Sequence, residues 1–124
     1  MTQEDKDLLL KDLCARLPYG VKGIIEDGIK VTTPSEWPVE KSIDYSMRYM
    51  VIKNGWRPYL FPMPYIDDNE KLFAEYITTL TYDSNIHSAV PTIKTLDFYN
   101  KYHLDYRGFI PKGIALDATS KNIY

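Results

Sequence analysis

Cysteine is almost absent from this 124-residue chain, and neither sign of charge is in strong excess. Cys14 is the single cysteine, which excludes an intramolecular disulfide and a cysteine-rich metal site and suits a reducing cytosol. The formal net charge is −2, whereas dedicated nucleic-acid binding needs a strong basic patch to neutralise phosphates. The composition therefore argues against DNA or RNA as the main partner.

Long hydrophobic runs and the common catalytic motifs are missing as well. No apolar run approaches the ~20 residues that span a bilayer, and residues 1–5 lack the basic and apolar regions of a signal peptide. There is no glycine-rich phosphate loop, no nucleophile elbow around a serine, and no pair of histidines at helical spacing. We therefore expect a cytoplasmic protein with no membrane partner, no metal site and no cofactor.

The chain is rich in tyrosine, with eleven of these residues. Tyrosine has an apolar body and a polar tip, so it suits both the rim of a small core and an interface. The length and the ordinary apolar content predict one domain over residues 1–124. The tail from about residue 117 carries few structural signals and is expected to be loose.

Helical periodicity predicts three helices. The first covers residues 2–17, with Thr2 as its cap and Cys14 on its apolar stripe as a small buried hydrophobe. The second covers residues 67–80, with Asp67 as its cap. The third covers residues 92–104.

Turn signals predict two hairpins, over residues 21–33 and 45–61. A two-residue turn in the first hairpin pairs Ile24 with Val31. In the second, Pro58 falls at a hydrogen-bonded position and has no donor to give. Either the register differs there, or this strand is an edge strand from Pro58 onward.

Together these elements predict an α+β fold. The expected architecture is a small antiparallel sheet of three to five strands, built from the two hairpins and packed with about three helices. Apolar residues on both faces of the second hairpin leave a curled, half-barrel sheet open as an alternative. Residues 34–44 and 81–91 are expected to be loops.

The first candidate site follows the third helix and contains His103, Asp105, Tyr106 and Arg107. A carboxylate can orient a histidine ring as a general base, which makes His103 and Asp105 the catalytic candidates. Alternatively, His103 lies in the last helical turn, where the helix dipole favours a cation, and Asp105 and Arg107 tie the chain down. No nucleophile or oxyanion donor can be named beside them, so the structural explanation is preferred.

The second candidate site is the basic second hairpin, where Arg48, Arg57, Tyr59 and Phe61 share one face in the expected register. Arginine beside aromatic rings can bind an anionic or planar ligand. Alternatively, the arginine stems only cover aromatic rings at the rim of the sheet.

Three stretches carry a resemblance: DLCARLPYGVK at residues 12–22, RPYLFPM at residues 57–63 and HLDYRGFIPKGIAL at residues 103–116. In this order they resemble a group of small uncharacterised proteins of gut Bacteroidales and their phages. That group has no established activity or catalytic residue. The resemblance therefore implies only a setting, that of an accessory protein carried on phage or mobile DNA.

The sequence leaves three functions open. The preferred one is a small non-enzymatic binding module that engages a protein or an anionic small ligand. The alternatives are a hydrolase or transferase that uses His103 and Asp105, and an assembly protein that oligomerises through exposed tyrosines. The residues expected to bind a ligand are Arg48, Arg57, Tyr59, Phe61, Tyr106 and Arg107.

Overall fold

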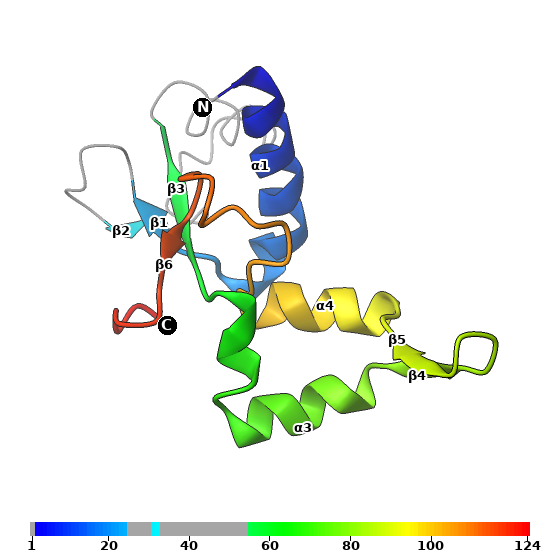
Figure 1. The fold of residues 1–124 in the computed structure, drawn as a ribbon. Coiled ribbons are helices and arrows are strands. Elements are labelled where there is room, and N and C mark those ends of the chain that lie inside the picture. Colours follow the sequence, from blue (N-terminus) through cyan, green and yellow to red (C-terminus); the bar gives the residue numbers. More distant parts are fainter. Residues whose placement is uncertain (1, 25–30, 33–54) are drawn as a thin grey trace.

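The computed structural model describes residues 2–24, 31–32 and 55–124 (Figure 1). In this part of the chain, three α-helices accompany a four-stranded sheet and a separate two-stranded hairpin, which confirms the predicted α+β class. The described strands do not close into a barrel. In chain order the elements are α1 (Gln3–Arg16), η1 (Leu17–Tyr19), β1 (Gly23–Ile24), β2 (Val31–Thr32), β3 (Arg57–Leu60), η4 (Met63–Ile66), α3 (Glu70–Thr78), β4 (Thr81–Asp83), β5 (Ser88–Val90), α4 (Ile93–Lys101) and β6 (Leu116–Asp117).

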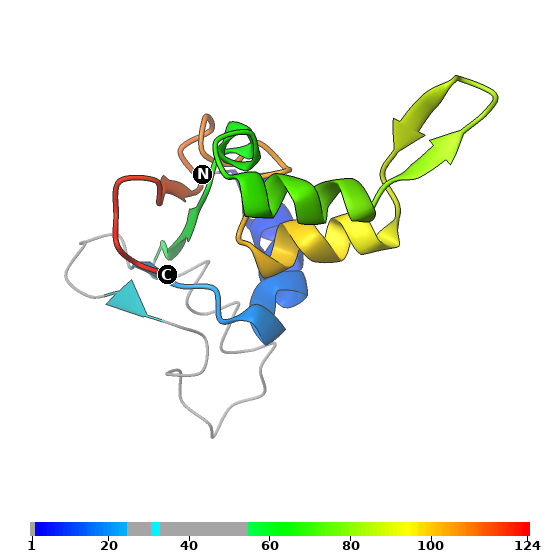
Figure 2. The same cartoon turned by 90° about the horizontal axis from the view of Figure 1, so that it is seen from below.

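The helices occupy two places around the sheet. Helix α1 runs beside the sheet, whereas α3 and α4 lie side by side at its lower end, and the β4–β5 hairpin extends from them (Figures 1 and 2). None of the helices in the described ranges has both the length and the apolar character that crossing a membrane requires. One core cluster contains Leu9, Leu13, Val21, Trp56, Leu60, Phe109, Ile114 and Ala115. A second contains Ile66, Leu72, Phe98 and Leu104.

Helix α1 begins as predicted but buries a different face. The Thr2 hydroxyl accepts a hydrogen bond from the Asp5 backbone N–H (3.0 Å), and the Asp5 carboxylate accepts one from the Thr2 N–H (3.1 Å). The prediction that Cys14 is buried is wrong, because its side chain is exposed. Inward positions of this helix are taken by Asp12 and Arg16, which form a buried ion pair.

Strand β3 is an interior strand, not an edge strand. It pairs antiparallel with β1 and parallel with β6, so the sheet is mixed where an antiparallel one was expected. Pro58 lies opposite Gly23, and the next residue, Tyr59, donates its N–H to Lys22 O (2.8 Å). Donors alternate along a strand, so the Pro58 nitrogen faces away from β1. No ladder bond is lost, because pairing with β6 begins only at Tyr59.

The first hairpin keeps its predicted register, whereas the second is only partly described. Ile24 pairs with Val31, as expected. The turn of the first hairpin and the expected partner strand of the second, with Arg48, lie outside the described residues.

Three boundaries in the second half of the chain differ from expectation. Asn69 caps α3, whereas Asp67 was the expected cap. Residues 81–91 were expected to be a loop, but they contain the β4–β5 hairpin. The third helix was expected over residues 92–104, but α4 is capped by Thr92 and ends at Lys101. His103 therefore lies beyond the last helical turn, with a left-handed backbone (φ 59°).

The tail from about residue 117, expected to be loose, is docked on the sheet. Ala118 is fully buried. The Tyr124 hydroxyl accepts a hydrogen bond from Lys22 N–H (2.8 Å) and donates one to Tyr59 O (2.8 Å). This hydroxyl therefore bridges a backbone donor of the β1 segment to a backbone acceptor of β3, which holds the tail in place.

Gly23 gives the first testable prediction, because a side chain has no room there. A Cβ at this position would lie 2.4 Å from the Trp56 ring and 2.5 Å from Arg57 O. We expect Gly23→Ala to lower the free energy of unfolding by about 3 kcal/mol in urea titration, since overpacking a tight site forces the backbone to shift. The control is Gly113→Ala, which has open space but a positive φ of 75°, and should cost about 1 kcal/mol. Equal losses in the two variants would contradict this packing.

Candidate functional site

The predicted hairpin site is only partly assembled in the described residues. Arg57 is half-buried on β3, and Tyr59 is buried against Ile24 and Ala118. Phe61 follows the strand and remains partly exposed. Of these residues, only Phe61 has a side chain that lines the open cavity described below.

The predicted His103–Asp105 pair is not joined by a hydrogen bond. The Asp105 carboxylate accepts hydrogen bonds from Phe109 N–H (2.8 Å) and Ile110 N–H (2.9 Å). It is buried, so these charge-assisted bonds fix the turn that follows it. Asp105 therefore holds the backbone in place, while His103 has no carboxylate partner among the described residues.

Tyr106 and Arg107 belong to a charge cluster that sequence reasoning missed. The Asp12 carboxylate accepts hydrogen bonds from Arg16 Nε (2.7 Å) and Arg107 Nε (3.0 Å). Arg16 Nη2 also donates to Leu104 O (2.6 Å). The Tyr106 ring lies near both guanidinium groups, with centroid distances of 5.2 and 5.1 Å. The signal in the sequence was an Asp and an Arg four residues apart on a helix, usually a surface pair.

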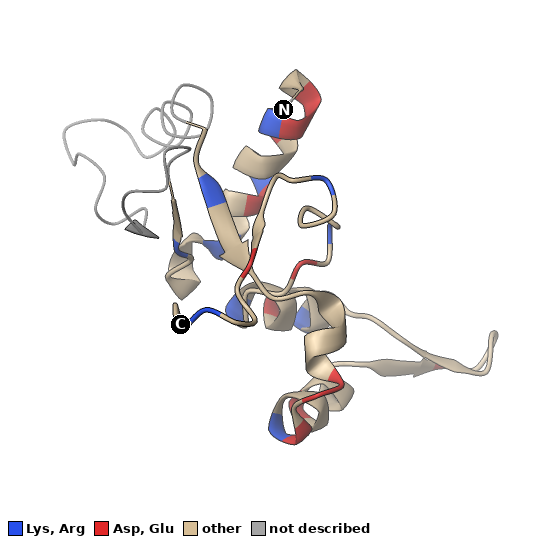
Figure 3. Cartoon of the chain, turned by 60° about the vertical axis from the view of Figure 1, so that its left-hand side comes forward, with Lys and Arg blue, Asp and Glu red and all other residues tan. Residues whose placement is uncertain are grey.

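Outside this cluster, charged residues are mixed along the helices. Figure 3 shows Lys, Arg, Asp and Glu side by side on α1, and acidic residues beside a basic one on α3. These helices therefore do not present a surface of one sign, and local positive charge depends on which lysines lack an acidic partner.

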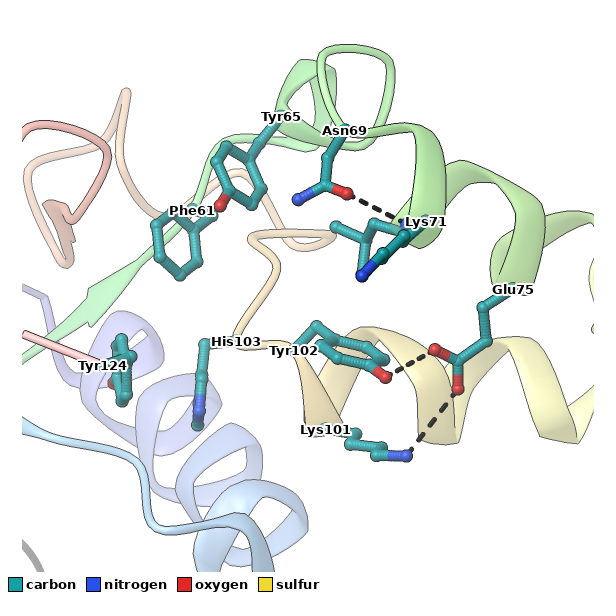
Figure 4. Close-up of a pocket in the computed structure, with 10 residues that line it drawn as sticks. Phe61, Tyr65, Asn69, Lys71, Glu75, Lys101, Tyr102, His103 and Tyr124 are labelled. Carbon is teal, nitrogen blue, oxygen red and sulfur yellow. Dashed lines mark hydrogen bonds and ion pairs between the residues drawn. The ribbon is translucent and has the colours of Figure 1, made fainter.

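An open cavity of about 500 Å³ lies where the segment after β3, helix α3, the end of α4 and the tail meet (Figure 4). Its size falls within the range of roughly 300–1,000 Å³ that small-molecule sites occupy. Aromatic rings dominate its lining, together with two lysines, an asparagine and a glutamate. The lining residues are Phe61, Tyr65, Asn69, Lys71, Leu72, Glu75, Lys101, Tyr102, His103 and Tyr124.

The rings form two stacked pairs. Phe61 and Tyr65 stack with centroids 4.3 Å apart, and His103 and Tyr124 stack with centroids 3.7 Å apart. Phe61 N–H donates to His103 O (2.8 Å), and Phe61 O accepts from Asp105 N–H (2.8 Å). These main-chain hydrogen bonds hold the backbone of Phe61 beside that of His103, and so place the two stacked pairs next to each other.

The polar groups of the lining differ in how they are paired. Glu75 accepts a hydrogen bond from the Tyr102 hydroxyl and forms an ion pair with Lys101 (3.7 Å). Lys71 has no ion pair within the described ranges. Asn69 Oδ1 accepts from a backbone N–H of α3, so its amide nitrogen stays available. In Figure 4 this nitrogen and the Lys71 amine are directed towards the space between the aromatic rings.

The ionisation of His103 is set by its surroundings. Burial, reinforced by the positive charges of Arg16 and Lys22, lowers the pKa of His103 to about 4. The ring is therefore neutral at pH 7, and its Nδ1 atom is buried without a hydrogen-bond partner. Burial also raises the pKa of Tyr124, so its hydroxyl stays protonated and keeps donating to Tyr59 O.

With His103 neutral, charge in the cavity comes from Lys71, Lys101 and Glu75. Two lysines against one glutamate leave a single net positive charge. The arrangement is suited to holding a group with negative charge against aromatic rings. Among the described residues, no three histidine, cysteine, aspartate or glutamate side chains are grouped closely enough to hold a metal ion.

Comparison with known proteins adds no relative. No family model matches the chain, and neither a curated protein nor a solved structure matches it.

The charge cluster leads to a prediction for stability. We expect Asp12→Asn to lower the free energy of unfolding by about 3 kcal/mol, because two arginines lose their carboxylate partner in a buried site. The matched control is Asp7→Asn, an exposed carboxylate of the same helix, which should cost less than about 0.5 kcal/mol. Urea titration of both variants measures the difference, and similar losses would show that the cluster contributes little.

His103 gives a prediction for pH dependence. Between pH values of about 6.5 and 4 the unfolded chain binds a proton at His103 and the folded chain does not, so stability falls as pH falls through this window. The shift corresponds to about 3 kcal/mol. His103→Asn accepts the left-handed backbone and should flatten the dependence of unfolding free energy on pH in this window.

The matched control for this experiment is His87→Asn, at an exposed residue that also has a positive φ of 52°. It makes the same replacement at an exposed residue, so a change in pH dependence confined to His103→Asn is attributable to the buried ring. An unchanged pH dependence in His103→Asn would contradict a buried, neutral His103.

Proposed function

We propose that this protein is a non-enzymatic binding module that holds a small anionic ligand in the cavity beneath α3. The observation that supports this is the Lys71 amine, which has no ion-pair partner in the described part of the chain and borders a ring-lined cavity. A cation without a partner is available to an external anion, and the aromatic rings beside it offer apolar contact area to the rest of a ligand.

The cavity offers more than one donor to an anion. The Asn69 amide nitrogen lies on the same side as Lys71, and Lys101 lies across from them on α4 (Figure 4). Lys101 is already paired with Glu75 at 3.7 Å, so its contribution is reduced. Lys71 is therefore the main anchor in this proposal, with Asn69 as the second donor.

The alternative of a hydrolase or transferase that uses His103 and Asp105 gains little from the geometry. Asp105 is engaged by two backbone N–H groups, and it does not line the cavity. His103 is neutral and stacked on Tyr124, so it serves this proposal as a wall of the cavity.

The setting of the protein is also part of the proposal. The resemblance to proteins of gut Bacteroidales and their phages, together with the lone Cys14, supports an accessory role in the cytoplasm. Assembly through exposed tyrosines is a third function, for which Tyr82, 66% exposed on the β4–β5 hairpin, is the strongest feature. Light scattering distinguishes it, because a strict monomer at high concentration argues against assembly.

Anion binding by Lys71 is testable by NMR titration of ¹⁵N-labelled protein with acetate, inorganic phosphate and a nucleoside monophosphate. We expect shifts confined to residues that line the cavity. Lys71→Gln should weaken binding by about tenfold, which corresponds to about 1.4 kcal/mol for one charge-assisted contact.

The matched control is Lys112→Gln, which makes the same charge change at an exposed lysine that does not line the cavity. It should leave the affinity within about twofold, since Lys112 does not line the cavity and exposed charges are screened at physiological salt. Equal weakening by both variants, or no shift with any of the three anions, would rule out this site.

A further inference from the structure

Given the anion-binding function proposed above, the composition of the cavity lining restricts more than the sign of the ligand's charge. Two features carry this restriction: the rings that border the cavity and the single net charge. Phe61, Tyr65 and Tyr102 are only partly buried, and all three line the cavity. Flat apolar faces of this kind favour a flat partner, because stacking of aromatic rings is worth about 0.5–1.5 kcal/mol beyond the area buried.

The net charge of the cavity lining determines how many negative charges on a ligand can be compensated there. Lys71 faces the cavity without a partner, whereas the charge of Lys101 is offset by Glu75. Lys71 can pair with one negative charge on a ligand, whereas a second negative charge would have no uncompensated cation to pair with. A cavity with one uncompensated cation therefore suits one negative charge better than two.

The carboxylate of Glu75 strengthens this selection. Its oxygens bind the Tyr102 hydroxyl and Lys101, so the negative charge is fixed at the rim of the cavity. A second negative charge on a ligand would approach this carboxylate, and like charges at short range cost free energy.

We infer that the cavity selects a planar aromatic or heteroaromatic ring that carries one negative charge. The ring lies among Phe61, Tyr65 and Tyr102, and the anionic group accepts hydrogen bonds from Lys71 and Asn69. The volume of about 500 Å³ accommodates two fused rings and their substituent.

Four probes that differ in the aromatic ring or in the number of negative charges test this selection by isothermal titration calorimetry. They are 2-naphthalenesulfonate (ring and one charge), 2-naphthyl phosphate (ring and nearly two charges), methanesulfonate (one charge, no ring) and 2-naphthamide (ring, no charge). We expect 2-naphthalenesulfonate to bind about tenfold tighter than methanesulfonate or naphthamide, because each lacks one contact worth about 1.4 kcal/mol. It should bind about threefold tighter than 2-naphthyl phosphate at pH 7.5.

Two variants test the two features separately. Tyr65→Leu keeps the apolar bulk that packs against the second core cluster but removes the ring that stacks on Phe61, and should weaken 2-naphthalenesulfonate without changing methanesulfonate. Glu75→Gln keeps an acceptor for Tyr102 and adds a net positive charge, so the phosphate should become the tighter naphthyl probe. Glu70→Gln, an exposed residue of the same helix outside the cavity, is the matched control and should leave the order unchanged.

The outcomes separate this inference from the proposed function. If methanesulfonate binds as tightly as 2-naphthalenesulfonate, the role of the rings is overturned while anion binding stands. If 2-naphthyl phosphate binds the unaltered protein as tightly as the sulfonate, selection for one charge is overturned. If no charged probe binds, the proposed function fails as well.

Discussion

The buried Asp12 carboxylate is the constraint on which the rest of the structure depends. It accepts hydrogen bonds from Arg16 and Arg107, and so joins α1 to the segment that follows α4. A buried charge without a partner costs several kcal/mol, so moving α1 away from the segment after α4 is unfavourable. Arg16 also donates to Leu104 O, and Leu104 forms a bridge with Phe61. The wall of the cavity is therefore fixed by an ion pair that does not itself line it.

A row of aromatic rings extends this constraint to α3. The Tyr106 ring, which lies near both arginines, stacks on Tyr99 at 5.4 Å, and Tyr99 stacks on Tyr76 of α3 at 6.1 Å. Burial and the neighbouring Tyr76 raise the pKa of Tyr99 to about 12, so the central ring of the row stays uncharged over the physiological range. The row therefore links α3 and α4, which carry Lys71 and Lys101, to the charge cluster.

Features that depend on neighbouring residues could be predicted from the sequence, and those that depend on distant ones could not. The cap at Thr2 involves residues within three positions, and it was predicted. The exposure of Cys14 was missed because the partner of Arg16 beyond its own helix is 88 residues away. The candidate site shows the same limit: Phe61 and His103 were named, whereas Lys71, Glu75 and Tyr124 join them only through the fold.

Tyr124 shows why the cavity is a property of the whole domain. Its ring, stacked on His103, forms one wall of the cavity, while its hydroxyl bridges Lys22 N–H and Tyr59 O in the sheet. A displacement of the ring therefore breaks the hydrogen bonds that join its hydroxyl to Lys22 and Tyr59. A ligand that enters beside His103 meets a ring whose hydroxyl is hydrogen-bonded to two segments of the sheet, so the cavity widens there only if these bonds break. This rigidity favours flat ligands over bulky ones, since a flat ring needs no movement of Tyr124.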